Sequence, residues 1–273
     1  VEELRDETVS RGVRSYLGTA DGRAVEVVYL DRDDRDSELF ARALRSIRVR
    51  DVDEQSLSTR PRVRAAQLAL STSMAERAGA RVQSLLAVAP SEADSAIIVL
   101  DDASGSTLRD RATDGLSDSA LDDLWHQVGL LHGACMAHRS LSLDNLVVDG
   151  DRVTLLGLDT ALLAASPESR ATDRAELLVS TALVVGVERA LDAAVRNAPA
   201  DDLAATLAFV QRPALPPHAQ RDAKKPKSLI DDVRNGLQER LGVEQVELAE
   251  LERVSFGKIV TWIGFAVLAF FIL

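Results

Sequence analysis

The chain has 273 residues, of which 32 are lysine or arginine and 43 are aspartate or glutamate, so its formal net charge is −11. Hydrophobic residues make up 46% and charged residues 27%, a composition that excludes disorder along the whole length. The acidic balance argues against a nucleic-acid-binding protein, which needs a basic surface for phosphates. The single cysteine, Cys135, excludes an intramolecular disulfide and any site built from several thiolates.

The first hundred residues predict a β-rich segment with two helices. Residues 14–30 predict a hairpin, because strand-forming residues flank Asp21-Gly22 and Asp-Gly is a strong turn signal. Further elements are expected from apolar spacing and helix-stop signals: a helix at 37–46, a helix at 62–78, a strand at 82–88 and a buried strand at 96–100.

The rest of the chain predicts a mainly helical part with one small hairpin. The expected elements are a long helix at 116–137, a loop at 138–145, strands at 146–148 and 153–156, and helices at 172–196 and 200–209. Four prolines within 212–227 predict a linker, and a charged helix is expected at 228–240. The sequence therefore predicts an α+β, two-lobed fold with an N-lobe at 1–100 and a C-lobe at 101–211.

The last residues, 259–273, are an uncharged apolar run. Its 15 residues are fewer than the roughly 20 that span a bilayer, so we expect the truncated start of a transmembrane helix at 256–273. A buried C-terminal helix is the alternative. The positive-inside rule then places residues 1–255 on the cytoplasmic side of the cell membrane, with 212–255 as linker and juxtamembrane helix. Anionic lipids are expected near the only lysines of the chain, Lys224, Lys225, Lys227 and Lys258.

One motif points to a specific chemistry. The segment from His138 to Asn145 reads H-R-S-L-S-L-D-N and lies between a predicted long helix and a predicted strand pair. It resembles the catalytic loop H-R-D-L-x-x-x-N of protein kinases and of aminoglycoside-phosphotransferase-like kinases. The resemblance implies a protein-kinase-like fold over about residues 10–210. It places Asn145 where the family holds magnesium and Ser140 where the family has its catalytic aspartate.

The chain departs from this pattern at both acidic positions. Ser140 is neutral at pH 7 and a poor base, so it cannot by itself replace the aspartate that orients the attacking hydroxyl; Asp144 is the available substitute. The family's D-F-G aligns with Gly157-Leu158-Asp159, which puts glycine at the metal-binding aspartate and Asp159 two residues late.

The nucleotide-holding parts are missing as well. No lysine precedes Lys224, and Arg23 and Arg32 are the cations that flank the third strand. Ala66 falls near the position of the helix glutamate, and no G-x-G-x-x-G loop is present. We therefore expect no cofactor, unless the chain is an atypical kinase that uses ATP and magnesium. Cys135 is expected to be a small buried residue.

The whole chain resembles the kinase-like region that precedes the membrane helices in actinobacterial proteins of the lysylphosphatidylglycerol synthase transmembrane, or flippase-like, family. The segments that carry this resemblance are 36–45, 76–82, 124–125 with 131–132, 137–145, 173–178, 185–190 and 251–254. It implies a pseudokinase that regulates or scaffolds its own downstream transmembrane domain, a lipid-handling protein of the cell envelope. The alternatives are an ATP-dependent phosphotransferase using Asp144, Asn145 and Asp159, and a domain that packs on the membrane part without any ligand.

Overall fold

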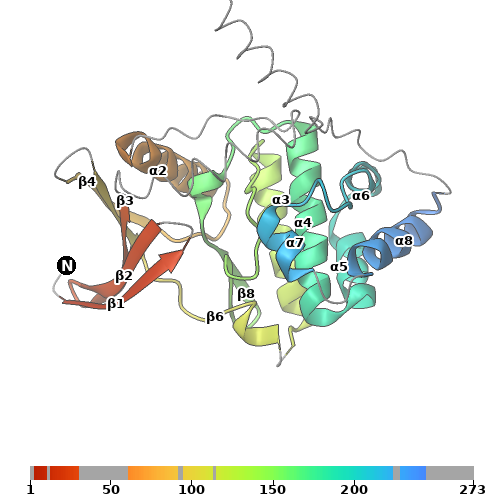
Figure 1. Cartoon of the computed structure of the whole chain (residues 1–273), viewed down its shortest axis with the longest axis horizontal. Coiled ribbons are helices and arrows are strands. Elements are labelled where there is room, and N and C mark those ends of the chain that lie inside the picture. Colours follow the sequence, from red (N-terminus) through yellow and green to blue (C-terminus); the bar gives the residue numbers. More distant parts are fainter. Residues whose placement is uncertain are drawn as a thin grey trace, which may run out of the picture.

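The computed structural model describes residues 3–10, 13–30, 61–91, 95–112, 115–223 and 228–243. These residues form a small lobe with a sheet and one helix, and a larger helical lobe (Figure 1). The helix expected at 37–46, all four lysines and the apolar run 259–273 lie outside the described residues. Within the described part, no helix is both long enough and apolar enough to cross a membrane.

The N-lobe sheet is antiparallel and has the strand order β1-β2-β3-β5-β4. Its strands are β1 (Glu3–Ser10), β2 (Val13–Ala20), β3 (Arg23–Leu30), β4 (Leu85–Pro90) and β5 (Ala96–Asp101). The expected hairpin is confirmed as β2 and β3, and its turn residues Asp21 and Gly22 both have positive φ, as a two-residue I′ turn requires. The sequence did not predict β1.

One helix, α2 (Pro61–Arg77), covers one face of this sheet. Directly opposite residues in an antiparallel pair share a face, and β3 pairs Val28 with Ile98. Both side chains are buried in one cluster with Leu68 and Ala75 of α2. The apolar face of the sheet and one face of the helix therefore form the N-lobe core. The helix predicted at 62–78 is confirmed as α2.

The C-lobe is built around α4 (Pro167–Val185), whose middle is buried almost throughout. Around it lie α3 (Asp118–Gly133), the small sheet of β6 (Ser106–Thr107), β7 (Leu146–Asp149) and β8 (Arg152–Leu155), the 3₁₀ turns η2 (Asp110–Ala112) and η3 (Leu158–Thr160), and the helices α5 (Val187–Asn197) and α6 (Ala200–Leu207). The single helix expected at 172–196 is wrong. Gly186, with φ 83°, ends α4 and starts α5.

Residues 212–243 do not form the expected linker and juxtamembrane helix, in the part that the structure describes. They contain α7 (Pro217–Asp222), which lies against α4, and α8 (Leu229–Leu241), which packs on α4, α5 and α6. Ile230, Val233 and Leu237 of α8 are buried in the same core as the rest of the C-lobe. The boundary predicted at 211 is therefore wrong, because apolar residues at helical spacing in α8 outweigh the proline-rich composition before it.

Hydrogen bonds from the segment that follows α2 hold the N-lobe against the C-lobe. The N–H of Leu155 in β8 donates to the carbonyl of Arg81 at 2.9 Å. The Arg81 guanidinium donates to Asp123 of α3 at 2.7 Å and to the carbonyl of Val153 at 2.8 Å. A five-stranded sheet with one helix, docked in this way on a helical lobe that holds a loop and a small hairpin, is a protein-kinase-like arrangement.

Candidate functional site

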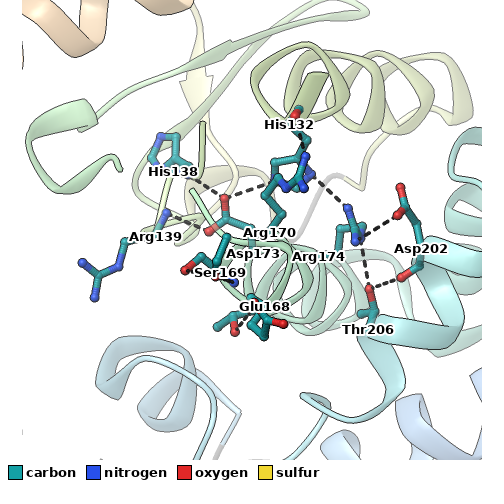
Figure 2. Close-up of polar contacts among 12 residues, drawn as sticks. His132, His138, Arg139, Glu168, Ser169, Arg170, Asp173, Arg174, Asp202 and Thr206 are labelled. Carbon is teal, nitrogen blue, oxygen red and sulfur yellow. Dashed lines mark hydrogen bonds and ion pairs between the residues drawn. The ribbon is translucent and has the colours of Figure 1, made fainter. Parts of the chain in front are cut away.

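The loop at 138–145 connects α3 to β7, and α4 supports it from below. The backbone N–H groups of His138 and Arg139 donate to the two carboxylate oxygens of Asp173 at 2.5 and 2.7 Å (Figure 2). Asp173 and His138 are both buried. A charged acceptor that receives two backbone donors fixes the start of the loop on the most buried helix of the lobe.

The same carboxylate also orients His132 of α3. His132 Nε2 lies 3.2 Å from Asp173, and His132 Nδ1 lies 3.3 Å from the guanidinium of Arg174. Because a guanidinium can only donate, Nδ1 accepts and Nε2 carries the proton that it donates to Asp173. Arg174 continues the network to Thr206 at 3.1 Å and to Asp202 at 3.4 Å, and burial lowers the pKa of its guanidinium (Figure 2).

A second set of contacts supports the middle of the loop. Ser180 of α4 donates to the carbonyl of Leu141 at 2.9 Å. Glu176, one turn before Ser180 and fully buried, contacts Nε2 of His218 in α7 at 2.5 Å. Burial raises the pKa of Glu176, and the contact with His218 opposes that rise. The loop is thus held by α4 directly, and α7 is fastened to the same face of α4.

Ser140 and Asn145, the two positions that the motif singles out, lie in contact. The Asn145 amide donates from Nδ2 to the carbonyl of Ser140 at 2.8 Å and to its hydroxyl at 3.1 Å. Ser140 is buried. The two ends of the loop are therefore tied to each other, with the hydroxyl of Ser140 at the position where the kinase motif has a carboxylate.

Gly157 lies against the side chain of Asn145, which would have to shift to admit a side chain at position 157. A Cβ atom built on Gly157 would lie 2.7 Å from Nδ2 and 3.0 Å from Cγ of Asn145. Gly157 also has φ +74°, a conformation that residues with a side chain rarely adopt. The position that aligns with the metal-binding aspartate of D-F-G is thus occupied by a glycine, whose positive φ and close contact with Asn145 both disfavour a side chain.

Asp159 lies in η3 and faces the N-lobe helix. Its carboxylate is 3.9 Å from the guanidinium of Arg64 in α2, and the two side chains are 28% and 12% exposed, respectively. Ala66, the expected counterpart of the helix glutamate, is exposed on the outer side of α2, so that alignment is wrong. The α2 residue that reaches the C-lobe is therefore a cation, Arg64, and its partner carboxylate comes from η3.

Asp144 is engaged on another side of the loop. Arg109 donates to both of its carboxylate oxygens, at 2.5 and 2.9 Å, and also to Asp222 of α7 at 3.1 Å. The hydrogen bond that Arg109 donates to Asp144 is the main reason why the pKa of Arg109 is raised. Asp144 and Asp159 are thus paired with arginines from different parts of the chain, Arg109 between β6 and η2 and Arg64 in α2. Among the described residues, no group of three or more His, Cys, Asp or Glu side chains is placed to hold a metal ion.

The third strand presents a carboxylate, not a cation, toward α2. Glu26 pairs with Leu100 and so lies on the sheet face that α2 covers, and Gln83 donates to it at 2.7 Å. Arg23 lies on the other face, and Arg32 is outside the described residues. Burial, followed by the charge of Glu26, raises the pKa of Asp102 just after β5. The side chain that β3 places here is thus acidic, where the family has a lysine that holds a phosphate.

Several supporting residues were not assigned a role from the sequence, namely Arg64, Arg109, Asp173, Glu176 and His218. Asp173 binds backbone N–H groups 34 and 35 residues earlier in the chain, and such a partnership has no sequence motif of its own. Cys135, which the sequence predicts as buried, is exposed. Its φ of 55° just after α3 turns the chain there and directs the side chain outward.

The sequence matches no protein-family model and no curated protein. Among solved structures, the chain is similar to WaaP, determined in complex with acyl carrier protein: 17% of residues are identical, 87% of this chain and 89% of that chain are covered, and the TM-score is 0.48. A likeness at this level does not decide the fold, which rests on the elements and contacts described above.

Proposed function

We propose that this chain is a pseudokinase domain, with a kinase-like fold that does not transfer phosphate. The observation that carries the proposal is the contact between Gly157 and Asn145. A kinase holds magnesium with two residues, the aspartate of D-F-G, which aligns with Gly157, and the asparagine of the catalytic loop, which aligns with Asn145. Here the asparagine side chain is bonded to Ser140 and fills the space that a side chain at position 157 would need.

Two further features support the absence of phosphoryl transfer. Ser140 offers a neutral hydroxyl, which is a poor base at pH 7, and Asp144 beside Asn145 is paired with Arg109. Glu26 places negative charge where the phosphates of a nucleotide would be held. The supporting frame of the loop, centred on Asp173, is fully formed. The domain therefore has the architecture of a kinase without its reactive groups.

The domain regulates or scaffolds a membrane protein in this proposal. The support is the resemblance to the region ahead of the membrane helices in lysylphosphatidylglycerol synthase transmembrane proteins, together with the apolar run 259–273. The partner is then the transmembrane domain that follows in the same protein, a lipid-handling protein of the cell envelope. Residues 1–255 lie on the cytoplasmic side, and lysines such as Lys224 and Lys258 meet anionic lipid.

An atypical ATP-dependent phosphotransferase is the second candidate. One contact favours it: the N–H of Leu156 donates to the carbonyl of Asn145 at 2.8 Å, which draws the segment carrying Asp159 toward the loop. Asp159 keeps 28% of its side chain exposed. Asn145 and Asp159 would then hold magnesium, and Asp144 would act on the substrate hydroxyl after release from Arg109.

Thermal unfolding of the full chain in mild detergent, with and without ATP and magnesium, separates the two candidates. The pseudokinase proposal expects no magnesium-dependent rise in Tm with ATP. A rise that Asn145→Ala and Asp159→Asn abolish, and that the exposed control Asp231→Asn keeps, would establish nucleotide binding at this site. Transfer of the γ-phosphate to any acceptor under those conditions would then replace the proposal with the second candidate.

A further inference from the structure

The short helix α7 is connected to the loop at 138–145 by two sets of polar contacts. The first passes through α4, where His218 of α7 contacts the fully buried carboxyl of Glu176. Burial raises the pKa of Glu176, and the contact with His218 and the backbone N–H of Leu141 both oppose the rise. Glu176 therefore lies between α7 and the middle of the loop.

The second set passes through Arg109. Nη2 of Arg109 donates to Asp222 of α7 at 3.1 Å and to Asp144, near the end of the loop, at 2.9 Å. His218 and Asp222 are four residues apart, so they lie on the same side of α7. One side of this helix is thus connected to the loop both at its middle and at its end.

α7 has little apolar packing to hold it in place. Ala219 is its one buried residue, and an alanine side chain removes little apolar area from water. The next helix along the chain, α8, buries four larger side chains, those of Leu229, Ile230, Val233 and Leu237. Elements with few buried apolar side chains open at a lower free-energy cost than the rest of a fold. We therefore expect α7 to leave the C-lobe more readily than α8 does, once its polar contacts break.

We propose that α7 is a strap that keeps the loop at 138–145 in one arrangement, and that an anionic lipid surface detaches it by binding the lysines that follow. Lys224, Lys225 and Lys227 come directly after Ala223, which is fully buried. With α7 attached, these lysines start from the body of a chain whose net charge is −11, and an anionic surface repels that body. Detachment of the six residues of α7 frees roughly 20 Å of chain, at about 3.3 Å per residue.

The freed length gives the lipid surface a different affinity for the two states, which any ligand needs in order to shift an equilibrium. The Debye length is about 8 Å at physiological ionic strength, so roughly 20 Å of chain lets the lysines reach the surface while the acidic body stays out of range. The lipid step rests on the membrane placement proposed above, whereas the strap itself rests on the contacts of His218 and Asp222.

Amide hydrogen exchange of the full chain in mild detergent tests the strap. His218→Ala combined with Asp222→Ala should raise the exchange rate about tenfold in peptides that cover α7 and the loop, and should leave α5 and α8 unchanged. Arg221→Ala is the matched control, because Arg221 is an exposed residue of the same helix. His218→Gln in place of His218→Ala keeps a donor for Glu176 and should restore most of the protection at the middle of the loop.

Reconstitution of the full chain into vesicles tests the release. Vesicles that contain phosphatidylglycerol should raise the exchange rate in α7 and in the loop together, relative to vesicles of phosphatidylcholine alone. Lys224→Gln, Lys225→Gln and Lys227→Gln together should remove that difference. Inorganic phosphate added to phosphatidylcholine vesicles should have no effect, which distinguishes a lipid surface from free phosphate.

Three results would overturn the proposal. If the loop amides of the wild-type chain are less protected than those of α7, the loop opens without the strap, and this comparison needs no variant. If the double variant exposes α7 but leaves exchange in the loop unchanged, the two contacts do not hold the loop. If phosphatidylglycerol has no effect, or inorganic phosphate has the same effect, release by a lipid surface is wrong. ATP plays no part in these measurements, so their outcome is independent of the pseudokinase proposal.

Discussion

At the scale of single residues, the backbone of the loop at 138–145 is firmly held, but the side chains at its kinase-like positions differ from those of a kinase. Asp173 accepts from the backbone of His138 and Arg139, so the loop has one defined shape. Position 140, where a kinase has its catalytic aspartate, carries a serine hydroxyl, and position 157, where it has the D-F-G aspartate, carries no side chain. Because the side chain of Asn145 packs on Gly157, the change at position 157 involves a neighbouring residue and is more than the loss of one carboxylate.

Gly157→Ala tests that packing. We expect it to reduce the free energy of unfolding by about 2–3 kcal/mol, because a positive φ costs about 1 kcal/mol for alanine and the contact with Asn145 adds a steric cost. Gly150→Ala is the control, since Gly150 has φ +59° and no atom within 4 Å of the added Cβ. Urea denaturation measures both. Equal losses of unfolding free energy in the two variants would show that the side chain of Asn145 moves aside and that position 157 can accept a side chain.

Asp173→Asn tests the support of the loop. The substitution keeps the shape but replaces an acceptor of two backbone N–H groups by a neutral amide, whose own N–H₂ would face a donor. The expected loss is about 2–4 kcal/mol of unfolding free energy, because the two buried N–H groups lose a charged partner. Asp202→Asn, in the same network but half exposed, should change it by no more than about 0.5 kcal/mol. A loss no larger for Asp173→Asn than for Asp202→Asn would contradict this support.

At the scale of elements, local patterns predicted most strands and helices, and the failures have physical causes. The hairpin of β2 and β3 followed from Asp21-Gly22, because a two-residue turn is a local interaction. The break at Gly186 and the packing of α8 depend on contacts with elements far away in the sequence. In the candidate site, Ser140 and Asn145 were predictable from the motif, whereas Asp173 and Arg64 act through partners that only the fold brings near.

The burial of α8 gives a prediction at this scale. Val233→Ala should cost about 1–3 kcal/mol of unfolding free energy, because it leaves a cavity against the C-lobe. Asn235→Ala, on the exposed side of the same helix, should leave the stability unchanged or raise it slightly, since alanine is the better helix former. Chemical denaturation compares the two variants. A helix that served only as a linker would show no loss for Val233→Ala.

At the scale of the whole molecule, a few polar contacts fix the N-lobe on the C-lobe. Arg81 follows α2 and reaches both Asp123 of α3 and the carbonyl of Val153 in β8. Asp123 also accepts from the backbone N–H of Val153 at 2.6 Å. Burial alone would raise the pKa of Asp123, but the hydrogen bonds from Val153 and Arg81 hold it below its usual value. The charged form of Asp123 is therefore the form that joins the lobes.

The lowered pKa of Asp123 predicts how the free energy of unfolding changes at acid pH. A carboxyl whose pKa is lowered by folding stabilises the fold above its unfolded pKa of about 3.9, and the contribution is lost as the pH falls through the lower folded value. Asp123→Asn should therefore lower the unfolding free energy at pH 7 and flatten its decline below about pH 4. Arg81→Gln should flatten that decline only in part, because the bond from Val153 remains. Denaturant titrations of the three proteins between pH 3 and 7 measure this, and parallel profiles for wild type and Asp123→Asn would show that Asp123 does not carry the acid sensitivity.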